Sequence, residues 1–288
     1  MTLSINLLKP YESPFELIRI GGNEDGAYLI PNDLKNIKAC FSPGVSNRKD
    51  FEDELARKYN IKSYMCDFSS DLGNFKTDLI NEMQFFDKKW LDINNKENTI
   101  SLDIWVKKYI SNCTDDLMLQ MDIEGAEYRN LLAASETLLN RFRILVIELH
   151  NVHTLVQDES DNEVELLLKK LNRTHLCVHA FPNNCCGEII DEVTGMNIPR
   201  VIELTFLRKD RFINGIKSLT SAIPNQKDIA VNVIGFPPLH LNKRWFHPKK
   251  RTFKSKTKIL KDLVWFRLFK IKEKLPLKTM LLNFLRLR

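Results

Sequence analysis

Long apolar runs are absent from this chain of 288 residues. No stretch of about 18 apolar residues without charge occurs, so we expect no segment to span a membrane. The N-terminal sequence MTLSINLLKPYESPFE lacks a positively charged start followed by an apolar run, so no secretory signal peptide is predicted. We therefore expect a cytoplasmic protein.

Glycine-rich nucleotide-binding motifs are also missing. The chain has neither G-x-G-x-x-G nor G-x-x-x-x-G-K-[ST]. The first absence disfavours a nicotinamide dinucleotide site, and the second excludes a P-loop for nucleoside triphosphates.

Cysteine pairs with a recognisable spacing are lacking as well. The chain has six cysteines, of which only Cys185 and Cys186 lie close together. Their spacing fits neither a zinc module nor a dense disulfide framework. We interpret them as reduced thiols in a reducing compartment.

Basic residues are present but unevenly distributed. Residues 243–288 contain 16 Lys and Arg against two acidic residues, a net charge of +14. The rest of the chain contains 27 basic and 35 acidic residues, a net charge of −8. We expect an acidic body at 1–238, which begins with a hairpin element at 1–38, and a separate basic tail at 239–288.

The tail has the pattern of two basic amphipathic helices around Pro276. Apolar residues recur at helical spacing in 260–275 and in 277–285, with Lys and Arg between them. Such helices suit an anionic membrane surface, which would place the protein at the inner membrane face. Aromatic residues favour this interpretation: Trp245, Trp265, Phe266 and Phe269. Alternatives are folding back onto the body, contact with another copy, and, least favoured, nucleic acid; the oligomeric state is left open.

The body alternates between strand and helix patterns, which predicts an α/β fold. Strands separated by helices imply right-handed crossovers and a mainly parallel sheet covered on both faces. Two consecutive strands at the end predict an antiparallel edge strand. The expected strands are 17–20, 28–30, 39–42, 61–66, a segment within 84–91, 117–121, 144–149, 175–181 and 201–207. Four helices are expected: one that begins near Asn47 or Asp50 and ends near Tyr59, and three at 101–110, 125–139 and 161–172.

Polar residues gather where four of these strands end, which is where ligands of such sheets bind. They are the segment 42–47, Asp67, the segment 122–124 and the segment 148–150. Gly44 lets the backbone approach a ligand closely. Asp67 stands where an acidic residue can accept both hydroxyls of an adenosine ribose, although a turn or helix-capping aspartate is the alternative.

Several ordered motifs resemble the FkbM-type methyltransferase family. Residues 121–127 (MDIEGAE) look like its D-[VI]-E-G-A-E signature, and residues 19–28 (RIGGNEDGAY) resemble the R-x-G-G-x-x-D-G-G-Y element of one branch. Blocks similar to that branch also occur at 41–52, 179–184 and 199–205, so the resemblance covers about residues 15–210. The sequence departs from it in two places: Ala27 replaces a glycine, and Phe181-Pro182 interrupts the approach to two asparagines.

This resemblance implies a Rossmann-like class I methyltransferase fold, with S-adenosylmethionine as the cofactor. It further implies O-methylation of a hydroxyl on a sugar, a glycan or a related small metabolite. By motif position, Gly44 and its neighbours would line the methionine part, Asp67 would hold the ribose, and Asp122 and Glu124 would face the sulfonium and the acceptor. The inferred cofactor-binding residues are Ser42, Gly44, Ser46, Asn47, Glu52, Asp67 and Phe68.

A hydroxyl is a poor nucleophile, so a base or a metal helps to remove its proton. Candidate bases are His150, His153 and Glu124; a histidine has the better intrinsic pKa near neutral pH, but His150 also suits a structural hydrogen bond to backbone. Glu127 lies on the same helix face as Glu124. It could take part in the function, or it could only offset the positive end of the helix dipole. We expect catalysis from Asp122, Glu124 and His150, and acceptor contacts from His153, His179, Asn183 and Asn184.

A metal ion is compatible with the sequence but not predicted. Asp122, Glu124, His150 and His179 offer oxygen and nitrogen donors at neighbouring strand ends. They lack the tight spacing of a metal-binding motif, so no metal ligand is assigned.

Two other functions stay open at this point. Asp122-Ile123-Glu124 resembles a loose D-x-D motif, which would fit a metal-dependent glycosyltransferase that uses a sugar nucleotide. A non-catalytic module that binds cofactor or membrane is the other alternative.

Overall fold

The computed structural model describes residues 6–156, 162–228 and 232–246. All the described residues belong to one compact unit. The two predicted tail helices, with Trp265, Phe266 and Phe269, lie outside the described residues. No helix in the described segments is long and apolar enough to cross a membrane.

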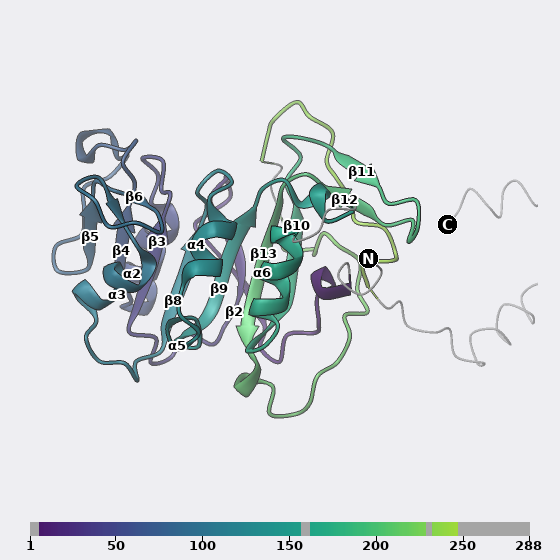
Figure 1. Cartoon of the computed structure of the whole chain (residues 1–288), viewed down its shortest axis with the longest axis horizontal. Helices are drawn as coiled ribbons and strands as arrows, with labels where there is room; N and C mark the ends of the chain where they lie inside the picture. Colours follow the sequence, from purple (N-terminus) through teal and green to yellow (C-terminus); the bar gives the residue numbers. More distant parts are fainter. Residues whose placement is uncertain (1–5, 157–161, 229–231, 247–288) are drawn as a thin grey trace, which may run out of the picture. The chain divides into compact units, whose positions relative to one another are not determined.

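A mainly parallel sheet of seven strands forms the centre of the described part (Figure 1). Five neighbouring strands run parallel, and β13 pairs antiparallel with β9 on one side and with β10 on the other. In spatial order the strands are β10 (His175–Pro182), β13 (Ile202–Arg208), β9 (Phe142–Leu149), β8 (Leu117–Met121), β3 (Ala39–Pro43), β4 (Lys62–Cys66) and β5 (Gln84–Asp87).

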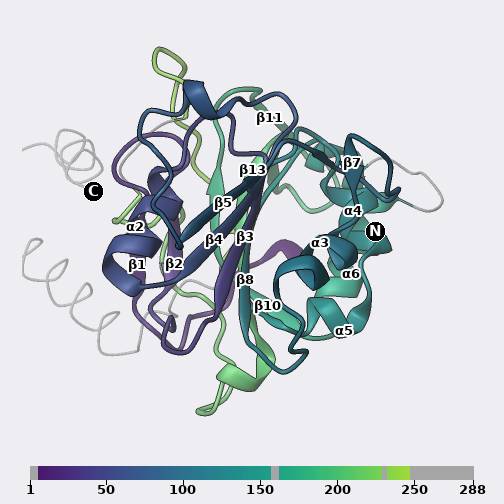
Figure 2. The same cartoon turned by 90° about the vertical axis from the view of Figure 1, so that its left-hand side faces the viewer.

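Helices and a hairpin cover the two faces of this sheet (Figure 2). One face carries α3 (Leu102–Tyr109), α4 (Glu127–Ala133), α5 (Glu136–Leu139) and α6 (Glu163–Leu171). The other carries α2 (Asp50–Tyr59) and the hairpin of β1 (Leu17–Ile20) and β2 (Tyr28–Pro31). Two shorter pairs complete the described strands: β6 (Trp90–Leu91) with β7 (Thr99–Ile100), and β11 (Glu188–Ile190) with β12 (Asn197–Pro199).

Alternation along the central strands produces two apolar clusters, one on each face. In β8, Leu117 and Leu119 belong to the cluster under α3, α4 and α6, whereas Met118 belongs to the cluster under α2. All residues of β8 and β9 are buried, as expected for strands covered on both faces. The predicted α/β fold with a mainly parallel sheet is therefore confirmed.

The last two long strands along the chain form the predicted antiparallel pair at one edge of the sheet. β13 returns beside β10 and pairs with it, and it also fills the position next to β9, where Ile202 faces Leu149. The edge strand is β10. Local sequence patterns predict that β13 exists and pairs with β10. They do not predict that its other neighbour is β9, because this pairing depends on long-range packing.

The helix predicted from Gly125 to Leu139 is divided into α4 and α5. Ala134 and Ser135 have extended backbone conformations, with ψ of 139° and 145°. The Ser135 hydroxyl accepts a hydrogen bond from the Leu138 amide, which starts a new helix. The predicted stripe of apolar residues therefore comes from two helices.

Trp245 is buried, so the expectation that it contacts a membrane is wrong. It is fully inaccessible, and its indole Nε1 donates to the Asn197 carbonyl at 2.8 Å. Leu241 is buried in the same apolar cluster. The compact body thus extends beyond residue 238, where the change in charge predicts that it ends.

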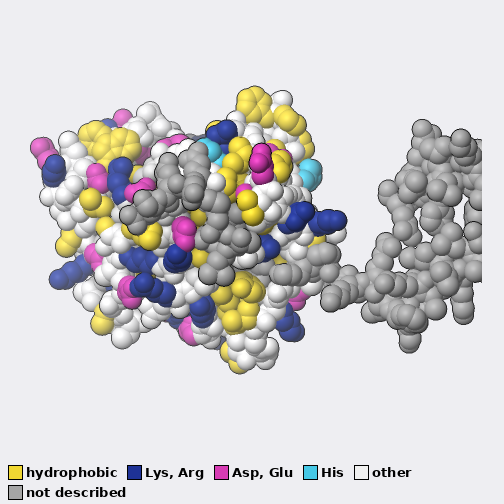
Figure 3. All heavy atoms as spheres, turned by 45° about the vertical axis from the view of Figure 1, so that its right-hand side comes forward, with side chains coloured by type: hydrophobic (Ala, Val, Ile, Leu, Met, Phe, Trp, Pro, Cys, Tyr) yellow, Lys and Arg dark blue, Asp and Glu magenta, His cyan; other side chains and the backbone are white. Residues whose placement is uncertain are grey.

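Basic, acidic and apolar side chains are interspersed on the face of the body drawn in Figure 3. No continuous patch of one charge sign covers the described residues visible there.

Candidate functional site

The carboxyl ends of β3, β4, β8 and β9 meet at one edge of the sheet, because these strands run parallel. The segments that follow them are 44–47, 67–71, 122–126 and 150–151. These are the four strand ends at which the sequence predicts the site.

Gly44 joins two of these loops by close backbone contact. Its φ is +83°, and a Cβ at this position would lie 1.6 Å from the Asp122 carbonyl oxygen. The Gly44 amide donates to the Cys66 carbonyl at 3.0 Å, and the Asp122 amide donates to the Pro43 carbonyl at 3.3 Å. Only glycine fits both the conformation and the space.

Asp67 binds the loop after β3 to the loop after β4. It is 5% exposed, and its Oδ2 accepts from the Ser46 amide at 2.9 Å. Its Oδ1 accepts from the amide and the hydroxyl of Ser69, at 2.8 and 2.6 Å. Asn47 adds a second connection, because its amide donates to the Ser70 hydroxyl and its Oδ1 accepts from the Asp71 amide.

A cavity of about 560 Å³ opens at this edge of the sheet. Of the predicted residues, Gly44, Ser46, Asp67, Asp122 and Glu124 line it. Trp90 and Arg129 also line it and were not predicted. Trp90 is 48% exposed, and its ring lies 5.7 Å from that of the predicted Phe68. Trp90 follows β5 closely and therefore lies at the same edge of the sheet, and this position could have identified it as a residue of the site.

A second, smaller recess of about 70 Å³ shares Gly44, Ser46 and Asp122 with the cavity. The N-terminal hairpin turn contributes Asp25, Gly26 and Tyr28 to its lining. Further lining residues are Val45, Arg48, Asp50, Phe51, Glu52 and Gln120. The motif at 19–28 therefore belongs to the site.

Glu52 belongs to the wall of this recess, and the Ser42 hydroxyl lies beside it. Both are buried, and Glu52 Oε1 has no hydrogen-bond partner among the described residues. Burial raises the pKa of Glu52 to about 7, although the Ser42 hydroxyl opposes the shift. Glu52 lines the recess, whereas Ser42 lines neither hollow.

His150 contacts two glutamates from the loop after β8. Its Nδ1 lies 3.2 Å from Glu127 Oε1, and its Nε2 lies 3.3 Å from Glu124 Oε2. Glu127 is fully buried, and the same Oε1 accepts from the amides of Ile123 and Gly125 at 3.0 and 3.1 Å. Glu124 is largely exposed and has a φ of +55°. Glu127 is thus a member of the site and not only a charge at a helix start.

Buried acidic groups shift one another's protonation at this site. Burial and the negative charge of Glu148 raise the pKa of Asp122 to about 8. Burial and the neighbouring Glu203 raise the pKa of Glu148 to about 8. Burial lowers the pKa of His150, but the hydrogen bond to Glu127 and the surrounding carboxylates outweigh it and raise the pKa to about 9.

The four residues predicted to contact an acceptor do not line the cavity or the recess. His179 Nε2 lies 3.1 Å from Asp228 Oδ2, and His153 Nε2 lies 2.9 Å from an Arg200 nitrogen. Asn183 donates to Glu148 Oε1 at 2.7 Å and accepts from the Cys185 amide. Asn184 holds the segment 233–236: it donates to the carbonyls of Val233 and Phe236 and accepts from the Val233 amide.

Comparison with known proteins identifies the domain that contains this site. Residues 34–174 match the family model of the methyltransferase FkbM domain. The match includes Gly44, Asp67, Asp122, Glu127 and His150, which form the site described above. No curated protein gives a significant match to the chain. The chain therefore contains a methyltransferase FkbM domain.

Proposed function

We propose that the protein transfers a methyl group from S-adenosylmethionine to a hydroxyl group of a sugar, a glycan or a related small metabolite. The observation that carries this proposal is the cavity of about 560 Å³ at the ends of β3, β4 and β8, with Gly44 and Asp67 in its wall. Its volume is within the usual range of roughly 300–1,000 Å³ for small-ligand sites.

The residues in the cavity wall fit the cofactor. Asp67 stands at the end of β4, where a carboxylate can accept from ribose hydroxyls, and its position is fixed by Ser46 and Ser69. The exposed ring of Trp90 offers a flat apolar surface for a base. Gly44 keeps the wall open to close approach of a ligand. When bound, S-adenosylmethionine supplies a methyl group that is already activated by the adjacent sulfonium.

Polar groups in the smaller recess can contact a hydroxylated part of the acceptor. Its lining contains carboxylates, a guanidinium and an amide, which can hydrogen-bond several hydroxyl groups. Asp122 lines both hollows and Glu124 lines the cavity, so these carboxyl groups can orient the acceptor, and the exposed Glu124 can accept its proton. His150 lies within 4.8 Å of Asp122 and pairs with Glu124, so it can hold these groups in place.

The family assignment removes the basis for a glycosyltransferase. Residues 122–124 lie inside the methyltransferase FkbM domain, and the D-x-D resemblance was the argument for that alternative. The same assignment favours an enzyme over a non-catalytic module.

The first test is calorimetric titration of the full chain with S-adenosylmethionine and with its demethylated product, in the presence of a chelator. We expect saturable micromolar binding that Asp67→Ala weakens about tenfold or more, because hydrogen bonds to a charged group contribute roughly 1.5–3 kcal/mol. Asp71→Ala is the matched control, since its carboxylate lies in the same loop but pairs with Lys88 at the surface. Equal affinity of Asp67→Ala and wild type would remove the ribose assignment.

The acceptor class needs a second test. Labelled S-adenosylmethionine is incubated with a panel of sugars, sugar nucleotides and glycans, and the methylated position is identified by mass spectrometry. Transfer to a hydroxyl is expected. Transfer to amines or carboxylates alone would contradict the proposed O-methylation.

The basic tail leads to a separate proposal. We propose that it attaches the enzyme to an anionic membrane surface on the cytoplasmic side, on the evidence of its charge of +14 and its amphipathic pattern. Flotation with vesicles tests this. Binding to vesicles rich in phosphatidylglycerol, lost at high salt and absent for phosphatidylcholine, is expected; equal recovery with both lipids would contradict it.

A further inference from the structure

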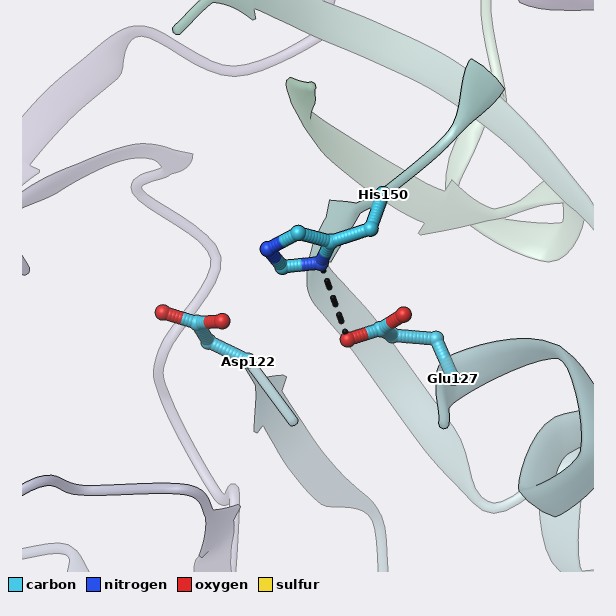
Figure 4. A group of neighbouring side chains, drawn as sticks. All are labelled: Asp122, Glu127 and His150. Atoms are coloured by element: carbon cyan, nitrogen blue, oxygen red, sulfur yellow. Dashed lines mark hydrogen bonds and ion pairs between the residues drawn. The ribbon is translucent and has the colours of Figure 1, made fainter. Parts of the chain in front are cut away.

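Asp122, Glu127 and His150 bring three potential metal ligands together from three chain segments (Figure 4). Asp122 follows β8, Glu127 begins α4, and His150 follows β9. One ligand atom of each lies within 4.8 Å of the corresponding atoms of the other two. Figure 4 shows the three side chains pointing toward one another.

The distances agree with donors that share one cation. Metal bonds to oxygen and nitrogen are about 2.0–2.2 Å long, so adjacent ligands of one ion are separated by roughly 3–4 Å. Glu127 Oε1 and His150 Nδ1 are 3.2 Å apart, within this range. The third donor, on Asp122, lies within 4.8 Å of both.

Two carboxylate oxygens in this cluster have no hydrogen-bond partner. Asp122 Oδ1 and Glu127 Oε2 are both inaccessible and unpaired in the described part of the chain. Glu127 is also the more deeply buried residue, with no exposed surface. Buried polar atoms in folded proteins are normally paired, and an ordered water or a bound ion can supply the missing partner.

Lysine and arginine do not balance the acidic groups of the cluster. Within the described residues, neither Asp122 nor Glu127 forms an ion pair with a lysine or an arginine, and one imidazole, that of His150, lies beside both. A divalent cation would balance both carboxylates directly.

We propose that Asp122, Glu127 and His150 form a binding site for a divalent cation of the Mn²⁺ type. Two carboxylates with one imidazole form a donor set that suits this class of ion. Because Asp122 lines both hollows, a ligand in either hollow can approach the cation. For the methyl transfer proposed above, on which this last step rests, the cation would lower the pKa of an acceptor hydroxyl that coordinates it.

The ligand set considered from the sequence was a different one. It combined Asp122 and His150 with Glu124 and His179. The structure places His179 at Asp228 and leaves Glu124 largely exposed, whereas Glu127 takes the buried position beside His150. This difference supplies a matched pair of variants, because substitution of Glu124 or of Glu127 removes one negative charge next to the same histidine.

The test measures Mn²⁺ binding to the chelator-treated full chain by loss of the electron paramagnetic resonance signal of free Mn²⁺. We expect one Mn²⁺ per chain, bound at least about tenfold more weakly by Glu127→Gln and by Asp122→Asn, and less than about threefold more weakly by Glu124→Gln. Glutamine at 127 keeps an acceptor for the amides of Ile123 and Gly125, so the loop can remain folded.

Two results would overturn the proposal. One is no Mn²⁺ binding by wild type at millimolar concentration, and the other is equal weakening in all three variants, which would indicate diffuse attraction by acidic residues. Binding of the demethylated cofactor is measured in the same samples. Cofactor binding without Mn²⁺ binding would leave the methyltransferase proposal intact and refute the metal site. Mn²⁺ binding without cofactor binding would support the metal site and contradict the methyltransferase proposal.

Discussion

The two halves of the site differ in how their polar atoms are used. In the loops after β3 and β4, both carboxylate oxygens of Asp67 accept hydrogen bonds from Ser46 and Ser69. In the cluster after β8 and β9, Asp122 Oδ1 and Glu127 Oε2 are buried without a partner among the described residues. The first half is preassembled by its own contacts, whereas the second has unpaired acceptors that a bound ligand would satisfy.

The largest effect is expected from Gly44→Ala, because Gly44 is where the two halves touch. The added Cβ would lie 1.6 Å from the Asp122 carbonyl oxygen, so one loop must move. We expect the rate of methyl transfer to fall about 100-fold, since displacements near 1 Å have effects of that size on rates, and the affinity for the demethylated cofactor, measured by calorimetry, to fall with it.

Gly215→Ala is the matched control for this prediction. Gly215 has the same φ of +83°, but a Cβ added there would have nothing within 4 Å, so the substitution introduces strain without a collision. We expect a loss of stability of about 1 kcal/mol and unchanged cofactor affinity. Equal effects of the two substitutions on cofactor affinity would mean that the contact with Asp122 does not matter.

Glu52→Gln tests whether the buried carboxylate in the wall of the recess costs stability. Burial raises the pKa of Glu52 from its ordinary 4.5 to about 7, so the folded protein holds a proton that the unfolded chain releases between these values. Wild type is therefore expected to lose stability as the pH rises from about 4.5 to 7, by up to about 3 kcal/mol. Glutamine cannot ionise and should remove this loss.

Denaturant unfolding at pH 5, 6, 7 and 8 measures this difference. Glu97→Gln is the control, because Glu97 is exposed and should leave the pH dependence of wild type unchanged. A pH dependence of Glu52→Gln that parallels wild type would assign the effect to other groups.

The smallest effect is expected from Asn184→Ala. This variant tests whether Asn184 supports the fold or contacts the acceptor. Asn184 donates to two carbonyls and accepts from one amide of the segment 233–236. Its loss should lower the free energy of unfolding, measured by denaturant titration, by about 1–3 kcal/mol. Unchanged stability with weaker acceptor binding would restore the role that the sequence suggested.

Most of the sheet could be predicted from the sequence because its signals are local. The runs LMLQM and ILVIEL identify buried strands, and the polar residues after them mark the ligand-binding edge. Since parallel strands end at the same edge, Gly44, Asp67 and Asp122 could be brought together without knowing the strand order.

The parts that could not be predicted depend on contacts between distant segments. Glu127 and His150 are 23 positions apart, and only the path of the loop after β8 decides that Glu127 turns toward the histidine. The partners of His179 and Asn184 come from residues 228–236, far along the chain. No local pattern indicates such pairs. The sequence therefore predicts that His179 and Asn184 contact a ligand, whereas in the structure they bind other parts of the protein.

The insertion of β13 between β9 and β10 has a consequence for the growing polypeptide on the ribosome. Until residues 202–208 have emerged, the facing sides of β9 and β10 have no strand to pair with, and their amide and carbonyl groups stay open in the interior of the sheet. Open strand sides of this kind invite pairing with other chains. The nascent chain is therefore most exposed to misassembly after β10 has been made and before β13 arrives, and a translational pause in that interval should lower the yield of native enzyme.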